Sequence, residues 1–161
     1  MKTHEIVGYA KALWMFVDVT GWQKWFGAAV LGFAFALDSN SNFSPLQFQG
    51  LAIGIPLIFC YIQSANDYFD VEIDEMKEKI MGKELVVSKI ISRKTALIIT
   101  SSVLFIGLGF AGMASASLFV LAVAMALLGT LYSAPPFRLK MRYPFSTLTQ
   151  FAGCFLPFLA G

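Results

Sequence analysis

The stretch LAIGIPLIFCYIQSANDYFDVEID, from Leu51 to Asp74, joins an apolar run directly to a row of polar and acidic residues. The first part, as far as Ile62, holds no charged residue, and with its neighbours it is long enough to form a helix across a hydrocarbon core about 30 Å thick. The second part places carboxylates where an isolated charge is costly. The stretch therefore predicts a membrane helix with a polar, functional end.

The composition of the whole chain also favours a membrane protein. Of its 161 residues, 57% are hydrophobic and 14% are charged, and the mean hydropathy is +0.69. A soluble domain of this size would need charges over its whole surface, whereas here they cluster in a few places. The net charge of +2 is too small to indicate a nucleic-acid partner.

Four apolar spans are predicted, and a fifth begins near Ser146. Because backbone groups in lipid must bond to one another, each span is expected to be a helix. The four cover approximately residues 22–37 with a few residues before them, 46–65, 96–114 and 117–132. The sequence thus predicts an all-α, multi-pass transmembrane helical bundle, forming one integral-membrane domain over residues 1–161.

The basic residues predict the topology. Of the 12 Lys and Arg residues, three lie before or at the start of the first span, six lie between the second and third, and three follow the fourth. The loops at 38–45 and 113–117 contain none. Since Lys and Arg are retained on the cytoplasmic side, we expect the amino terminus, the acidic row and both basic loops to face the cytoplasm across the cell inner membrane or an equivalent one.

The acidic row has the spacing of one helix face. Asn66, Asp70 and Asp74 recur every four residues, and Asp67 lies three residues before Asp70. Like charges at this spacing repel, so a cation is expected among them. Mg²⁺ prefers oxygen ligands and typically binds one or two carboxylates together with substrate phosphates. The row predicts a magnesium site for an isoprenoid diphosphate whose tail stays in the bilayer; the alternative is a solvated acidic surface.

A second segment, LYSAPPFRLKMRYP at 131–144, closes the fourth span. The Pro pair ends the helix, and hydroxyls and cations stand on either side of it. Such groups can bind an acceptor or phosphates. The alternative is that the prolines only stop the helix and the cations only fix topology. The polar side chains concerned are Tyr132, Ser133, Arg138 and Lys140.

Together the two segments resemble the UbiA superfamily of intramembrane prenyltransferases. Residues 66–74 match its first Asp-rich motif, NDxxDxxxD, position by position. YSAPPFRLK at 132–140 is similar to the segment that closes the family's fourth helix, and SKIISRKTAL at 88–97 to the entry of its third. The similarity covers roughly residues 20–161.

This resemblance implies a bundle of nine helices, dependence on Mg²⁺, and transfer of a prenyl group from its diphosphate to an aromatic or other lipophilic acceptor within the membrane. It implies that Asp70 and Asp74 are catalytic. It also implies three sets of binding residues: Asn66, Asp67, Asp70 and Asp74 for the metal; Lys83, Arg138 and Lys140 for the diphosphate; Tyr132 and Ser133 for the acceptor or the allylic carbon.

The family's second Asp-rich motif has no counterpart in this sequence, which contains no acidic residue after Glu84. We therefore expect the chain to be the amino-terminal part of a longer enzyme, with about five of the nine spans, and to be inactive by itself. The other hypothesis is a small, non-enzymatic multi-pass membrane protein whose acidic loop binds cations or a partner.

Overall fold

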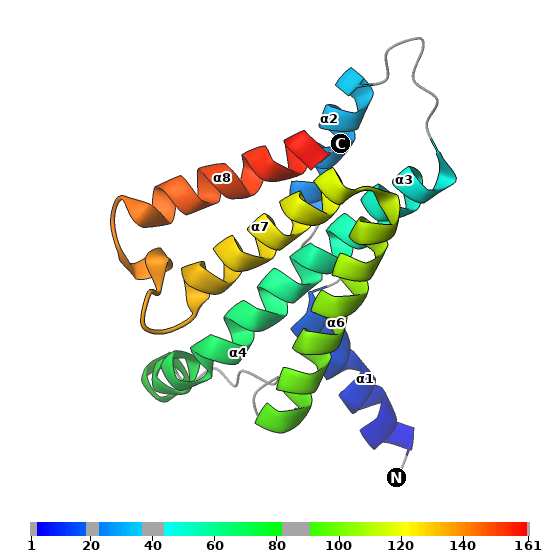
Figure 1. The fold of residues 1–161 in the computed structure, drawn as a ribbon. Coiled ribbons are helices and arrows are strands. Elements are labelled where there is room, and N and C mark those ends of the chain that lie inside the picture. The colour runs from blue at the N-terminus through cyan, green and yellow to red at the C-terminus, as the bar shows by residue number, and fades with distance from the viewer. Residues whose placement is uncertain (1–2, 19–22, 37–43, 82–90, 161) are drawn as a thin grey trace.

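The protein is described by a computed structural model, which covers residues 3–18, 23–36, 44–81 and 91–160 and, within them, leaves the side chains of residues 3–7, 23–25, 35–36 and 72–81 undescribed. Every regular element in these ranges is helical, and Figure 1 shows their arrangement. Three helices are long and apolar enough to cross a membrane: Pro45–Val71, Arg93–Ala114 and Ala116–Ser133. This confirms the expected all-α membrane bundle.

The central element begins as α3 (Pro45–Gln49), widens into a π-helical turn (Gly50–Gly54) and continues as α4 (Ile55–Met81). Ser44 caps its start: the Ser44 hydroxyl accepts a hydrogen bond from the Gln47 amide, and the Gln47 side chain accepts one from the Ser44 amide. The helix then runs through the whole acidic row, as the spacing predicted.

Helices α6 (Arg93–Ala114) and α7 (Ala116–Ser133) pack against α4, and α8 (Phe145–Ala160) packs against α7. Ser115 alone separates α6 from α7, and its hydroxyl accepts a hydrogen bond from the Leu118 amide to cap α7. Helices α4 and α7 run in the same direction, so their carboxyl ends lie at one end of the bundle (Figure 1). This brings the acidic row and the basic segment together.

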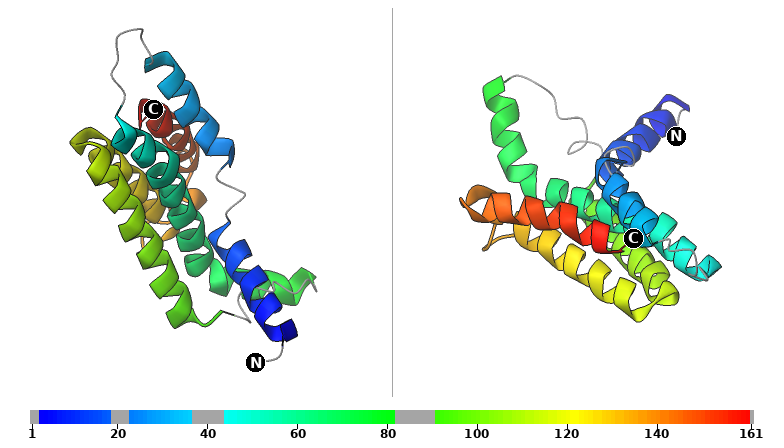
Figure 2. Two further views of the ribbon diagram at one scale, coloured as in Figure 1. Left: turned by 90° about the vertical axis from the view of Figure 1, so that its right-hand side faces the viewer. Right: turned by 90° about the horizontal axis from the view of Figure 1, so that it is seen from above.

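The expected first span differs from the structure. A separate helix, α1 (Thr3–Val17), precedes α2 (Gln23–Ala36), which has 14 residues. At 1.5 Å per residue α2 is only about 21 Å long, shorter than the hydrocarbon core. The fifth run is likewise a shorter apolar helix, α8, with 16 residues. Two views at right angles show α2 beside α8 and α1 at the opposite end (Figure 2).

Close helix contacts require small residues in this bundle. A Cβ added to Gly54, at the end of the π-helical turn, would lie 3.1 Å from the Ala111 nitrogen on α6. Gly107 on α6 faces it, with its own Cβ position 3.3 Å from the Gly54 carbonyl oxygen. Such contacts let backbones approach where no hydrophobic effect drives helices together. Large apolar side chains instead face outward; Phe105 and Phe151 are 71% and 69% exposed, as expected for a lipid-facing surface.

Candidate active site

A charged cluster joins the middle of α4 to the carboxyl end of α7 and the turn after it. The Lys140 ammonium donates to both carboxylate oxygens of Asp70 and, at 2.9 Å, to the Asn66 side-chain oxygen. Asn66 and Asp70 are one helical turn apart on α4, so their oxygens converge on the same cation. The two charged side chains are only 15% and 14% exposed.

Ser133, the last residue of α7, completes this cluster. Its side chain is fully buried, and its hydroxyl donates to the Asn66 side-chain oxygen over 2.9 Å. Lys140 can only donate, so the atom that it contacts must be the amide oxygen of Asn66 rather than the nitrogen. The orientation of the Asn66 amide is therefore fixed by its neighbours.

The segment after α7 turns back toward α4, so that Lys140 contacts Asp70. Helix α7 ends before the Pro pair, and Arg138 takes a left-handed conformation with φ 40°. A short 3₁₀ turn, Leu139–Met141, follows and carries Lys140. The Arg138 guanidinium donates to the Phe69 carbonyl at 3.3 Å, while its buried Nε has no hydrogen-bond partner. Arg138 thus keeps one donor for another ligand.

The remaining predicted residues have different positions. Asp67 is half-buried on α4, next to Asn66. Asp74 lies one turn beyond Asp70 on the same helix, but its side chain is outside the described part, and so is all of Lys83. Among the described residues, no three His, Cys, Asp or Glu side chains form a metal-binding group. The predicted metal roles stay predictions.

An apolar pocket of about 330 Å³ lies beside the cluster, between α4, α7 and α8. Asn66 belongs to both, because it also lines the pocket. Tyr132 lines the pocket as expected for an acceptor-facing residue, whereas Ser133 is not among its lining residues and points to Asn66 instead. The apolar walls come from Phe59, Ile62, Met125, Leu128 and Leu156.

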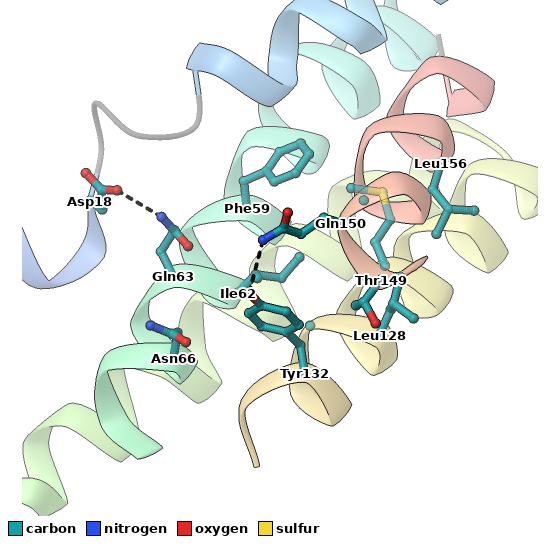
Figure 3. Close-up of a pocket in the computed structure, with 13 residues that line it drawn as sticks. Asp18, Phe59, Ile62, Gln63, Asn66, Leu128, Tyr132, Thr149, Gln150 and Leu156 are labelled. Carbon is teal, nitrogen blue, oxygen red and sulfur yellow. Dashed lines mark hydrogen bonds between the residues drawn. The ribbon is translucent and has the colours of Figure 1, made fainter. Parts of the chain in front are cut away.

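Two polar pairs in this pocket were not found by sequence reasoning (Figure 3). Gln63 donates to the Asp18 carboxylate over 3.1 Å, and Gln150 donates to the Tyr132 hydroxyl over 3.3 Å. The signal was present, since Gln63 and Gln150 are polar residues inside apolar spans, where such residues usually face the bundle interior. Gln63 is also three residues before Asn66, on the same helix face.

The fold and this site define a class: helical integral-membrane proteins with a polar, charged cluster at the mouth of an apolar pocket. Comparison with family models identifies the family, because residues 25–161 match the UbiA prenyltransferase family. The chain therefore belongs to that family, whose members transfer prenyl groups to lipophilic acceptors in membranes. No curated protein and no solved structure matches the chain.

Proposed function

We propose that this protein takes part in the Mg²⁺-dependent transfer of a prenyl group from an isoprenoid diphosphate to a lipophilic acceptor. The observation that carries the proposal is the position of Asn66, which is shared by the charged cluster and the apolar pocket. A substrate with an anionic head and an apolar tail needs such a boundary, with the head at the cluster and the tail in the pocket.

The oxygen donors at the cluster fit a hard cation. The Asn66 and Asp70 side-chain oxygens already converge on one cationic group, the Lys140 ammonium. We infer that Asn66, Asp67, Asp70 and Asp74 hold Mg²⁺, with Asp70 and Asp74 essential for catalysis. Bound Mg²⁺ would supply electrostatic neutralisation of the diphosphate.

The basic side chains that meet the cluster suit the diphosphate itself. The Lys140 ammonium is a single point charge on a flexible stem, so it can exchange one anionic partner for another. Arg138 has an Nε donor without a hydrogen-bond partner. We infer that Lys140 and Arg138 bind phosphate oxygens when substrate is present. Lys83 remains a further candidate, from the resemblance alone.

The pocket is suited to the chemistry that follows loss of diphosphate. Cleavage of the carbon–oxygen bond leaves an allylic cation, which water would quench. Walls such as Phe59, Ile62 and Leu156 exclude water and can contact a prenyl chain. We infer that Tyr132, at the polar side of the pocket, contacts the acceptor or the reacting carbon.

The distribution of Lys and Arg supports a cytoplasmic position for this site. Lys140 and Arg142 follow α7 at the same end of the bundle as the acidic row. By the positive-inside rule, we infer that this end faces the cytoplasm. Accessibility of a cysteine introduced at the exposed position Arg142 to an impermeant thiol reagent, in oriented vesicles, tests this orientation.

Transfer activity tests the proposal. Membranes bearing the full-length protein are incubated with radiolabelled geranylgeranyl diphosphate and a lipid extract of the host, and label in a new lipid is measured. Removing Mg²⁺ with a chelator should abolish product, and Asp70→Ala should lower the rate by about 100-fold or more while the protein still inserts in the membrane. Unchanged activity in Asp70→Ala would overturn the metal role.

A further inference from the structure

Tyr61 and Thr130 form a polar contact between α4 and α7. The Tyr61 hydroxyl oxygen lies 2.6 Å from the Thr130 side-chain oxygen. The Thr130 hydroxyl itself donates to the Ala126 carbonyl of its own helix over 2.7 Å. Since a Thr hydroxyl carries a single proton, the Tyr61 hydroxyl must be the donor between the two helices. The contact is therefore a hydrogen bond from α4 to α7.

This bond lies outside the candidate active site. Tyr61 is buried, with 8% of its surface exposed, and neither Tyr61 nor Thr130 is among the residues that line the pocket. Their chain neighbours Ile62 and Gly129 do line it. Hydrogen bonds of this kind hold membrane helices together, because lipid provides no hydrophobic force between them. The pair can therefore affect a bound substrate only through the positions of α4 and α7.

The contacts beside this bond define how far along α4 the helix α7 stands. A Cβ on Gly129 would lie 2.5 Å from the Ile62 Cγ1 atom, so the two helices approach closely where Gly129 has no side chain. Further along both helices, which run in the same direction (Figure 1), Ser133 donates to the Asn66 side-chain oxygen. A shift of α7 along α4 would disturb these contacts together.

The Ser133–Asn66 bond is sensitive to such a shift. Its length is 2.9 Å, and a separation of roughly 0.7 Å more would remove it. The last torsion of an Asn side chain has a broad preference, so the amide needs a neighbour to fix its orientation. Ser133 is fully buried at the end of α7, and its position follows that of the helix.

We propose that Tyr61 is a positioning residue for the charged cluster. Its hydrogen bond to Thr130 holds α7 at the height along α4 at which the Ser133–Asn66 bond forms. The consequence for substrate rests on the proposed function, in which Asn66 helps to bind Mg²⁺ and the diphosphate. The positioning itself is a property of the protein without substrate.

The side-chain amide of Asn66 reports on this positioning directly. The full-length protein is labelled with ¹⁵N-asparagine in detergent micelles, and the Asn66 signal is assigned by its absence from Asn66→Ser. Ser133→Ala removes the donor and gives the reference signal of an Asn66 amide without this bond. We expect Tyr61→Phe, which deletes only a hydroxyl, to shift the Asn66 signal at least halfway toward that reference.

Three variants on other helices complete the test. Thr130→Val removes the acceptor of the Tyr61 bond and should shift the Asn66 signal in the same direction, which also covers a failure of Tyr61→Phe to fold. Thr130→Ser keeps a hydroxyl and should leave the signal in place. Thr100→Val is the matched control, because Thr100 on α6 is also buried, at 6% exposure, but its hydroxyl has no hydrogen-bond partner among the described residues.

Two results would overturn the inference. One is an Asn66 signal that stays at its wild-type position in both Tyr61→Phe and Thr130→Val. The other is an equal shift in Thr100→Val, which would mean that loss of any buried hydroxyl disturbs the cluster. A Tyr61 that only stabilises the fold would lower the melting temperature of Tyr61→Phe without moving the signal.

Substrate binding separates this inference from the proposed function. The affinity for geranylgeranyl diphosphate with Mg²⁺ is measured by calorimetry on the same preparations. We expect it to fall about fivefold in Tyr61→Phe, the equivalent of one neutral hydrogen bond, and to stay near the wild-type value in Thr130→Ser. A shifted Asn66 signal with unchanged affinity, or with no binding to the wild type, would support the positioning and count against the proposed function.

Discussion

Lys140 and Asp70, 70 positions apart in the sequence, form an ion pair between the turn after α7 and the middle of α4. Both side chains are largely buried, and a buried charge without a partner is strongly destabilising. Lys140 therefore compensates the carboxylate in the protein without a metal. It also occupies the position on which the proposed metal ligands converge, so a metal ion and Lys140 should compete for Asp70.

Replacing Lys140 by Met tests this competition, because Met keeps much of the side-chain volume and removes the charge. We expect Mg²⁺ alone to bind several-fold more tightly to Lys140→Met, while the affinity for a prenyl diphosphate falls by roughly tenfold with the loss of a charge-assisted hydrogen bond. Calorimetry with each ligand measures both effects. Arg142→Met, at an exposed position in the same segment, is the control, and a parallel change in the two variants would contradict the prediction.

Ser133→Ala removes the second donor to Asn66. The Ser133 hydroxyl is buried and bonds at 2.9 Å, and the net contribution of such a bond is about 1 kcal/mol. We expect the free energy of unfolding in micelles to fall by about that amount, with a further loss of activity if Asn66 rotates. Ser102→Ala, at an exposed position of α6 where the hydroxyl bonds to its own helix, should have a smaller effect.

Gly32→Ala should weaken the contact between α2 and α8. A Cβ at this position would lie 1.8 Å from the Phe158 carbonyl oxygen, so the backbones must separate. We expect a loss of about 1–3 kcal/mol in unfolding free energy, the usual cost of overpacking. Gly27→Ala on the same helix meets nothing within 4 Å and should be neutral or stabilising, since Ala favours helix over Gly. Equal stability of the two variants would contradict this close approach.

Leu128→Trp should change the length of prenyl chain that the protein accepts. Leu128 lines the pocket, and a larger ring there reduces the space beside Phe59 and Leu156. We expect a preference shifted from geranylgeranyl toward geranyl diphosphate, measured as the ratio of their binding constants. The neighbouring Leu127 is 59% exposed on the outer side of α7, so Leu127→Trp should leave the ratio unchanged. A shift in both variants would argue against the pocket as the prenyl site.

Much of the fold was predictable from local features. The expected spans at 46–65, 96–114 and 117–132 correspond to helices that begin directly after the N-cap residues Ser44, Ser92 and Ser115. Capping by these hydroxyls and the uninterrupted apolar runs depend only on neighbouring residues. Helix α1 was not predicted, because its stabilising contacts are tertiary: Ala12 and Phe16 pack with Ile91 and Ala96, which are distant in sequence.

The candidate site also combines features that the sequence predicts with contacts that it does not. The spacing of Asn66 and Asp70 on one helix face follows from the sequence, as does the stop of α7 before its Pro pair. Three contacts could not be predicted from the sequence alone: that of Lys140 with Asp70, that of Ser133 with Asn66 rather than with the pocket, and that of Gln63 with Asp18.

What the sequence by itself determined is therefore periodic and local: an all-helical membrane chain, the end of α4 that carries the acidic row, and the family to which it belongs. Only the tertiary structure decided which distant side chains meet, namely the Lys140–Asp70 ion pair and the pocket with Asp18 in its wall. The physical reason is that helix formation in lipid satisfies the backbone within each segment. Contacts between segments depend instead on how the helices pack, at close approaches such as that of Gly54 and Gly107.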